Sequence, residues 1–512
     1  MRARMIPLVL LTSLTGLAST ARAASPAPNA AGQSDVVQRG AYLADVAHCT
    51  ACHTNDASKP FAGNYPIKSP FGTMYGANIT SDPTTGIGTW SEKDFEGALR
   101  RGVGKGGKYL YPAMPYIEFT KIGDADIHAL YAYFRTVKPV KEKTKPADMK
   151  FPFGVRTGIA AWQAVYFKQG RYTVDGSQSD QWNRGAYLVQ GLGHCDACHT
   201  PTNLAMAPKE GKALQGNIVD HWFAPNISGD QYSGIKDWSQ ADLVTYLKTG
   251  HNKKNDAAVG PMAQTIDLGL SHLDQGDLSA IAFYLKNQKV DPASAPKAAR
   301  PVSVAEKTSG QQIYTDNCES CHGADGKGVA GIAPSLVGAG STSGAEPQTA
   351  IRAVLQGFEP ANRWGVMPSF ARVFDAGQVS DVVNYIRTSW GNAGAGRVDP
   401  SLVTSLARYS DLADSKVEAA LVCPSASLLQ LDPSTVAQVN ALGAEPASKS
   451  ETAKLVRDYR ARHPRAVDTD IVTTISGAYC RNVMSAAKGT LVQRQQRYVD
   501  FMGNVSQAVA TR

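Results

Sequence analysis

The stretch Cys49-Thr50-Ala51-Cys52-His53 occurs in two further versions, Cys195-Asp196-Ala197-Cys198-His199 and Cys318-Glu319-Ser320-Cys321-His322. Cys-x-x-Cys-His is the attachment pattern of c-type haem. Its two thiols lie one helical turn apart and can each add to a haem vinyl group, while the following His can ligate the iron. A zinc site needs four gathered ligands, and a redox Cys pair does not need the His each time. The three copies therefore predict three covalently bound haem c groups.

The N-terminus of the 512-residue chain has the pattern of a secretory signal peptide. Arg2 and Arg4 precede a mainly apolar run over 5–17, and Ala21-Arg22-Ala23 is a small-x-small cleavage site. The apolar run is short for a membrane span, so we expect removal of residues 1–23 and export. No later segment has the length and apolar purity of a transmembrane helix.

Charge gives little support to nucleic-acid binding. The formal net charge of +8 includes three signal-peptide arginines, and without them 49 basic residues face 44 acidic ones. Each haem adds two propionates, so we expect a solvated surface and no nucleic-acid partner.

Six of the eight cysteines belong to the three motifs. The other two, Cys423 and Cys480, can form a disulfide in an oxidising compartment. Two free buried thiols are the alternative, and the sequence does not separate the two.

The first two motifs lie in segments that resemble each other. Arg39-Gly40-Ala41-Tyr42-Leu43 matches Arg184-Gly185-Ala186-Tyr187-Leu188, and Trp90-Ser91 with Asp94 matches Trp238-Ser239 with Asp242. An amphipathic helix is expected to close each of the three repeats, over 126–135, 277–286 and 378–387. The three helices share a tyrosine: Tyr133, Tyr284 and Tyr385.

These repeats predict a mainly α fold of three tandem class I cytochrome c-like domains plus a helical C-terminal extension. The expected division is signal peptide 1–23, haem domain one 35–140, linker 141–180, haem domain two 181–289, linker 290–304, haem domain three 305–391 and a C-terminal domain 397–512. The second linker is rich in proline and alanine. We expect Gly391 to Gly396 to be a flexible junction.

The region after residue 396 has no haem motif, and its pattern is mostly helical. An apolar stripe follows Val492, Val499, Met502, Val505 and Val509. A small helical bundle, joined by Cys423 and Cys480, is the favoured interpretation. A docking or membrane-surface element is the alternative.

Each repeat also offers one methionine for the sixth iron position, which decides what a haem does. Met114, Met262 and Met367 all follow the motif His, precede the closing helix and lie directly beside a proline that stiffens the backbone. We expect His53 with Met114, His199 with Met262, and His322 with Met367 as iron ligands, an arrangement that suits electron transfer. Met74 and Met206 compete but have no counterparts in the other repeats. His48 and His194 are expected at the surface or beside the site.

Residues 36–390 resemble the triple-haem cytochrome c subunit of bacterial membrane-bound dehydrogenases for alcohols, gluconate and sorbitol. The stretches that carry the resemblance are Cys49 to Thr54, Gly76 to Thr80, Leu110 to Tyr116, Ala129 to Phe134, Phe151 to Phe153, His194 to Pro201, Ala224 to Ile227 and Gly260 to Met262. As in single-haem cytochromes c, the carbonyl of Pro334 is expected to bind the other ring nitrogen of His322.

The resemblance implies an electron-transfer subunit with no catalytic residue of its own. It would take electrons from a quinoprotein, flavoprotein or molybdoprotein subunit, in a complex that oxidises CH–OH donors, and pass them to ubiquinone or a terminal oxidase. The implied place is the periplasm, on the outer face of the cytoplasmic membrane as a peripheral protein. Two departures stand out: Thr202 replaces the family's usual Arg, and over a hundred residues follow the third haem domain.

Three alternatives remain open from the sequence. One is a stand-alone multi-haem oxidoreductase of the peroxidase or thiosulfate type, which needs an exposed iron. The second is the cytochrome subunit of a molybdenum hydroxylase. The third is a binding module in which 397–512 recognises a partner.

Overall fold

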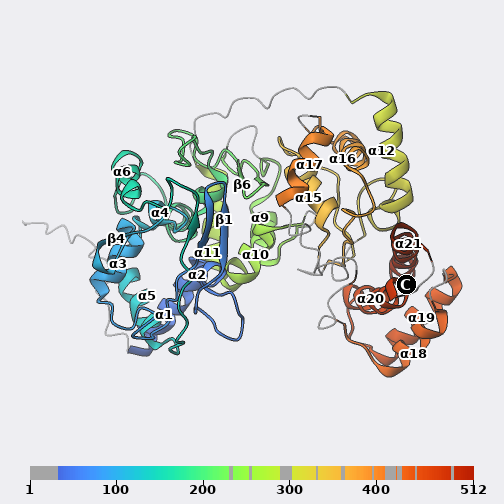
Figure 1. Ribbon diagram of the computed structural model, residues 1–512, viewed down its shortest axis with the longest axis horizontal. Helices are drawn as coiled ribbons and strands as arrows, with labels where there is room; N and C mark the ends of the chain where they lie inside the picture. The colour runs from blue at the N-terminus through green and yellow to red at the C-terminus, as the bar shows by residue number, and fades with distance from the viewer. Residues whose placement is uncertain are drawn as a thin grey trace, which may run out of the picture.

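A computed structural model gives the structure of the chain (Figure 1). It describes residues 33–229, 234–252, 257–288, 302–329, 332–358, 364–394, 397–409, 423, 429–443, 447–485 and 489–511. The expected signal peptide, its cleavage site and most of the linker 290–304 lie outside these residues. Below, unit 1 means residues 35–140, unit 2 181–289, unit 3 305–391 and the C-terminal unit 397–512.

Helices dominate every unit, as the sequence predicted, and the strands are short. Unit 1 and the segment after it contain α1 (Gln33–Val46), α2 (Cys49–His53), β1 (Pro66–Ser69), β2 (Gly72–Tyr75), α3 (Glu92–Arg101), β3 (Val103–Gly104), η1 (Lys105–Gly107), β4 (Lys108–Tyr109), α4 (Tyr116–Phe119), α5 (Asp124–Thr136), β5 (Asp148–Met149) and α6 (Thr157–Tyr166). Unit 2 contains α7 (Asp180–Tyr187), η2 (Leu188–Leu192), α8 (Cys195–His199), β6 (Asn217–Val219), β7 (Trp222–Ala224), α9 (Gln240–Thr249), α10 (Pro261–Leu268), η3 (Leu270–His272) and α11 (Gln275–Asn287).

In their described parts, the regular elements of unit 3 and the C-terminal unit are all helices. Unit 3 contains α12 (Val304–Asn317), α13 (Glu319–His322), α14 (Gly340–Ser343), α15 (Gln348–Gln356) and α16 (Ala376–Thr388). The C-terminal unit contains α17 (Pro400–Tyr409), α18 (Pro433–Leu442), α19 (Lys449–Arg462), α20 (Asp468–Ser485) and α21 (Leu491–Ala510).

The same helix crossing organises units 1, 2 and 3. The first helix of each unit, α1, α7 or α12, packs on the closing helix, α5, α11 or α16. A glycine lies at each crossing: a methyl group on Gly40, Gly185 or Gly310 would lie 2.0, 2.0 or 2.2 Å from a backbone carbonyl oxygen of the closing helix. Each glycine also contacts the tyrosine that the closing helices share. Glycine is therefore required at these positions because the backbones touch.

The repeated Trp-Ser-x-x-Asp pattern proves to be a helix start. The Ser91 hydroxyl accepts a hydrogen bond from the Asp94 amide at 3.2 Å, and Ser239 accepts one from the Asp242 amide at 3.0 Å. In each case the aspartate side chain bonds back to the serine amide, which completes a capping box. The pattern thus fixes where α3 and α9 begin.

The strands form small antiparallel pairs. Strand β2 pairs with β1, Ile67 opposite Met74, and with β5, Thr73 opposite Asp148. Two further pairs are β3 with β4 and β6 with β7. Because β5 lies in the segment after unit 1, that segment is held on the unit. The Asn78 side chain holds it as well, with hydrogen bonds to the Val140 and Glu142 carbonyls at 2.8 and 3.0 Å.

Units 1 and 2 share one apolar core, whereas unit 3 and the C-terminal unit have cores of their own. Helix α17 packs in the core of unit 3, where Val403 and Leu406 are buried. The core of unit 3 thus extends past residue 391, the end expected from the sequence. In Figure 1, units 1 and 2 lie together on one side, and unit 3 and the C-terminal unit on the other.

In the described part of the glycine-rich junction, 391–394, the Asn392 side chain makes four hydrogen bonds. The Asn392 side chain accepts hydrogen bonds from Gly338 and Ser343 and donates to the carbonyls of Leu336 and Ile386, at 2.7–2.9 Å. Residues 395–396 lie outside the described part. These four hydrogen bonds hold Asn392 in place and argue against the expected flexible junction at this residue.

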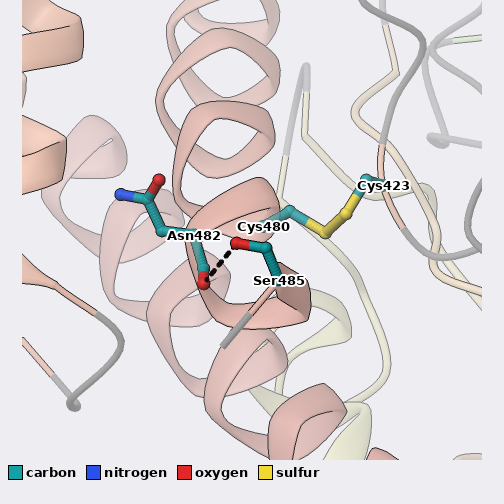
Figure 2. The surroundings of a disulfide bond; sticks show 4 residues. All are labelled: Cys423, Cys480, Asn482 and Ser485. Atoms are coloured by element: carbon teal, nitrogen blue, oxygen red, sulfur yellow. Dashed lines mark hydrogen bonds between the residues drawn. A yellow bond between two sulfur atoms is a disulfide. The ribbon is translucent and has the colours of Figure 1, made fainter. Parts of the chain in front are cut away.

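The C-terminal unit has the helices that the sequence predicted, and Cys423 and Cys480 form a disulfide with an S–S distance of 2.06 Å. Figure 2 shows this bond between Cys423 and Cys480 of α20; further along the same helix the Ser485 hydroxyl donates to the Asn482 carbonyl at 3.2 Å. Val499, Met502, Val505 and Val509 of the predicted stripe are all buried, and the side chain of Val492 lies outside the described part. Among the described residues, no helix combines the length and apolar character that crossing a membrane needs.

Candidate haem-binding sites

The three motifs form short helices at equivalent places. Helices α2 and α8 each begin after a histidine with left-handed backbone geometry, His48 (φ 52°) and His194 (φ 37°), and α13 follows α12 directly. All six motif thiols are free, in contrast to Cys423 and Cys480. Burial raises the pKa of Cys49, Cys195 and Cys318 to about 12. A raised pKa disfavours the thiolate on which a redox-active Cys-x-x-Cys pair depends.

Each motif histidine is held in the orientation that an iron ligand needs. Nδ1 of His53, His199 and His322 lies 2.7, 2.8 and 3.0 Å from a backbone carbonyl oxygen. Since a carbonyl only accepts, Nδ1 carries the proton, and Nε2 is the nitrogen left to bind a metal. Burial lowers the pKa of all three imidazoles, which favours their neutral form. These side chains fit a haem iron.

The three carbonyls come from equivalent loops. They belong to Ala77, Pro225 and Pro334. The expected hydrogen bond from His322 to Pro334 is confirmed. The corresponding partners in units 1 and 2 were missed, although the repeated Asn-Ile-Thr and Asn-Ile-Ser stretches directly follow Ala77 and Pro225 and mark the same place.

Unit 3 contains a cavity that brings His322 and Met367 together, along with both motif cysteines and the Pro334 loop. Its lining is mostly apolar. Backbone hydrogen bonds in both directions between Met367 and Phe358, at 2.8 and 3.0 Å, hold the methionine in place. A methyl group on Gly357 (φ 65°) would lie 2.3 Å from the Met367 carbonyl oxygen, so this turn needs glycine. The cavity fits an apolar group placed between the two side chains.

In units 1 and 2, the predicted methionines and the first motif cysteines pack against the shared core. Met114 and Met262 are half-buried there, as are Cys49 and Cys195. Met114 lies in a turn, whereas Met262 is the second residue of α10 rather than part of a loop. Of the competitors, Met74 is paired in β2 and Met206 is 43% exposed.

His48 and His194 do not lie at the surface. Their rings meet edge to face, with centroids 5.3 Å apart, where units 1 and 2 join. Burial and the neighbouring His194 lower the pKa of His48 to about 3, so that ring is neutral. Of the two expected places, the surface is wrong for His48, which the packing of one unit on the other buries, while His194 is half-buried beside its motif.

Units 1 and 2 are joined by reciprocal contacts of equivalent residues. The Tyr42 hydroxyl donates to Asp277 at 2.7 Å, and the equivalent Tyr187 donates to Asp126 at 2.6 Å. Arg39 and Arg184 each pair with the aspartate of their own unit. Burial by itself would raise the pKa of Asp277, but hydrogen bonds from Arg184 and Tyr42 outweigh it and lower the pKa. The repeated Arg-Gly-x-Tyr stretches therefore form an interface with local two-fold symmetry.

A buried carboxyl group lies in this interface. Glu118, on α4, is 3% exposed. Burial, with Asp196 of the second motif nearby, raises its pKa to about 8. Sequence reasoning missed Glu118 because its surroundings come from another unit.

Comparison with known proteins agrees with these sites. The model of the Cytochrome c family matches residues 37–138 and 308–390, which places the chain in the class of c-type cytochromes. The gluconate 2-dehydrogenase cytochrome c subunit of Pantoea cypripedii is 38% identical over 397 residues, which are 72% of this chain and 89% of that protein. The fructose dehydrogenase cytochrome subunit of Gluconobacter japonicus is 38% identical over 413 residues, 75% of this chain and 85% of that protein.

The chain belongs to the family of cytochrome c subunits of gluconate, fructose and alcohol dehydrogenases. It is an electron-transfer subunit that carries covalently bound haem c. A further relative, a nicotinate dehydrogenase subunit of Pseudomonas putida, is 41% identical over 359 residues, which are 69% of this chain but only 30% of that protein.

Proposed function

We propose that the chain binds three haem c groups and relays electrons from a dehydrogenase subunit to ubiquinone or a terminal oxidase. The thioether pairs are Cys49 with Cys52, Cys195 with Cys198, and Cys318 with Cys321. The observation that carries the proposal is the repeated histidine geometry: all three motif imidazoles donate from Nδ1 to a carbonyl and keep Nε2 for a metal. When bound, haem c supplies reversible one-electron chemistry at its iron.

The proposed sixth ligands are Met114, Met262 and Met367. Support is strongest in unit 3, where His322 and Met367 line one cavity. Oxidised low-spin haem with His and Met ligands has a sulfur-to-iron charge-transfer band. We expect the oxidised protein to have this band with the intensity of three such haems and no high-spin signal. A high-spin, ligand-binding haem would contradict the proposal and favour the peroxidase-type alternative.

We further propose that the protein works in the periplasm as a peripheral protein of the cytoplasmic membrane. Apolar side chains around α6 are unusually exposed: Phe151 is 88%, Val165 70% and Leu204 102% accessible. The Trp162 indole donates to the Ala205 carbonyl at 2.8 Å, which holds the Leu204 loop beside α6. Exposed apolar patches of this kind mark interaction sites. Flotation with anionic vesicles tests membrane binding, with Val165→Ser and Leu204→Ser expected to weaken it.

The partner is proposed to be a quinoprotein or flavoprotein that oxidises CH–OH donors. The similarity to the nicotinate dehydrogenase subunit favours a second candidate, the cytochrome part of a molybdenum hydroxylase that oxidises N-heterocycles. Isolation of the native complex and analysis of its prosthetic groups decides between them. A quinone or flavin supports the first candidate and a molybdenum cofactor supports the second.

A further inference from the structure

The histidine in front of each of the first two motifs is covered by the other unit. Phe119, which follows Met114 in unit 1, packs its ring 5.6 Å from that of His194 in unit 2. In return, Gly269, which follows Met262 in unit 2, packs on the His48 ring of unit 1, where a methyl group would lie only 2.2 Å from Cδ2. Units 1 and 2 therefore close the same face of each other's motif.

Among the described residues, no further motif-bearing unit covers the motif face of unit 3. Helix α21 of the C-terminal unit lies at that face instead. The Gln496 side chain donates to the Asp316 carbonyl at 3.0 Å, just before the motif. A methyl group on Gly503 would lie 2.5 Å from Cβ of Ser320, inside the motif. The buried Ser506 hydroxyl contacts the Cys321 thiol.

The contacts follow one face of α21. Residues 496, 499, 503 and 506 are spaced by three and four, which places them on one side of a helix. Val499 lies in the core of unit 3, while the neighbouring Met502 and Val505 lie in the core of the C-terminal unit. Helix α21 is therefore shared between the two cores.

The contacts between the C-terminal unit and unit 3 extend to the cavity of unit 3. Val472 of α20 and Met502 and Ser506 of α21 line the same cavity as His322 and Met367. Ile332 and Ala333, from the loop before Pro334, join the apolar core of the C-terminal unit. The C-terminal unit thus forms one wall of the third haem site.

Unit 2 forms another wall. Residues 257–260, just before Met262, line the cavity. Thr349 of α15 exchanges hydrogen bonds with the Phe223 backbone at 3.1 and 3.3 Å. The Arg352 guanidinium lies 4.6 Å from the Trp222 ring centre and donates to the Asp220 carbonyl at 2.7 Å. Unit 3 is therefore fixed to unit 2 on this side.

We propose that the C-terminal unit takes the place of a partner haem unit: it covers the motif face of unit 3, shields the third site from water and closes that face to redox partners. Electron exchange at the third site is then directed to the side shared with unit 2 and to other faces of unit 3. This inference rests on the proposed function in one respect, since it takes a haem to be attached at Cys318 and Cys321.

The proposal is tested with a substitution that pushes α21 away from the motif of unit 3 and leaves the C-terminal unit in the chain. Gly503→Leu places a large side chain against Ser320, and Gln507→Leu places the same side chain at an exposed position of α21 as a control. In the haem-loaded full chain, we expect Gly503→Leu to speed amide hydrogen exchange in residues 318–322 about tenfold, equivalent to about 1.4 kcal/mol. One of the haem midpoint potentials should fall, since water favours the more highly charged ferric state. Gln507→Leu should change neither.

Unchanged exchange in residues 318–322 and unchanged potentials in folded Gly503→Leu would overturn the proposal. If Gly503→Leu does not fold, Val472→Ala applies the same criteria by opening the wall of the cavity at α20. The haem content of the wild-type chain is measured in parallel. A missing third haem would count against the proposed function, whereas unaltered exchange would count against the cover alone.

Discussion

The glycine at each helix crossing makes the sharpest prediction about the fold. In Gly185→Ala, the added methyl group would lie 2.0 Å from the Ala280 carbonyl oxygen and 2.6 Å from Cβ of Tyr284. Ordinary contact begins near 3.4 Å, so α7 and α11 must separate by more than an ångström. Overpacking costs up to about 3 kcal/mol, and the helix preference of alanine over glycine returns about 1 kcal/mol. The clash is with backbone, so no change of rotamer relieves it. We therefore expect the free energy of unfolding to fall by about 2 kcal/mol.

The control is Gly158→Ala in α6, where the new methyl group meets nothing within 4 Å. It should be neutral or stabilising by about 0.4–1 kcal/mol. A chain with several cores need not unfold in one step, so amide exchange within α7 and α11 is the assay. A loss of 2 kcal/mol corresponds to about thirtyfold faster exchange there. Equal exchange rates in the two variants would refute the argument from close backbone contact.

Three further predictions follow from other sites. Glu118 has a pKa raised to about 8 by burial, so folding takes up a proton between its usual pKa of about 4.3 and 8, and stability falls as the pH rises through that window. Glu118→Gln should therefore unfold at a higher temperature than wild type at pH 9 but not at pH 4; the same difference at both values would contradict this explanation. Met367→Ala should remove about a third of the proposed charge-transfer band and leave haem content unchanged, and a band of full intensity would exclude Met367 as a ligand. Asn392→Ala removes four hydrogen bonds of a buried side chain and should destabilise the region around it by about 3 kcal/mol, measured by amide exchange in residues 336–343 and 386–394, against little for the exposed Asn287→Ala; a similar small loss in both would restore the flexible-junction interpretation.

The parts of the fold that depend on local sequence could be predicted. The closing helices and the motif helices follow from periodicity and spacing, which act over a few residues. The hydrogen bond from His322 to Pro334 was expected from the likeness to single-haem cytochromes c. The matching Arg-Gly-x-Tyr stretches revealed the repeat, but not that Gly185 contacts a carbonyl or that Tyr187 bonds an aspartate of the other unit. Those roles depend on which elements meet.

The features that sequence reasoning missed are all contacts between units. His48 and His194 lie beside the motifs, and the packing of unit 1 on unit 2 buries His48 and half-buries His194. Glu118 looks like an ordinary helical glutamate until α4 meets the second motif. Helix α21 shows an amphipathic stripe, and nothing in that stripe says that Gly503 and Ser506 lie on a haem motif far earlier in the chain.

The central claim is that three equivalent sites each hold a covalent haem. The most direct measurement is the haem-to-polypeptide ratio of the purified haem-loaded protein, from pyridine haemochrome absorbance and intact mass after denaturation. We predict three haems that stay attached to the chain, and loss of one in Cys318→Ala/Cys321→Ala. A ratio of two or fewer in the wild-type protein, or release of haem on denaturation, would contradict it.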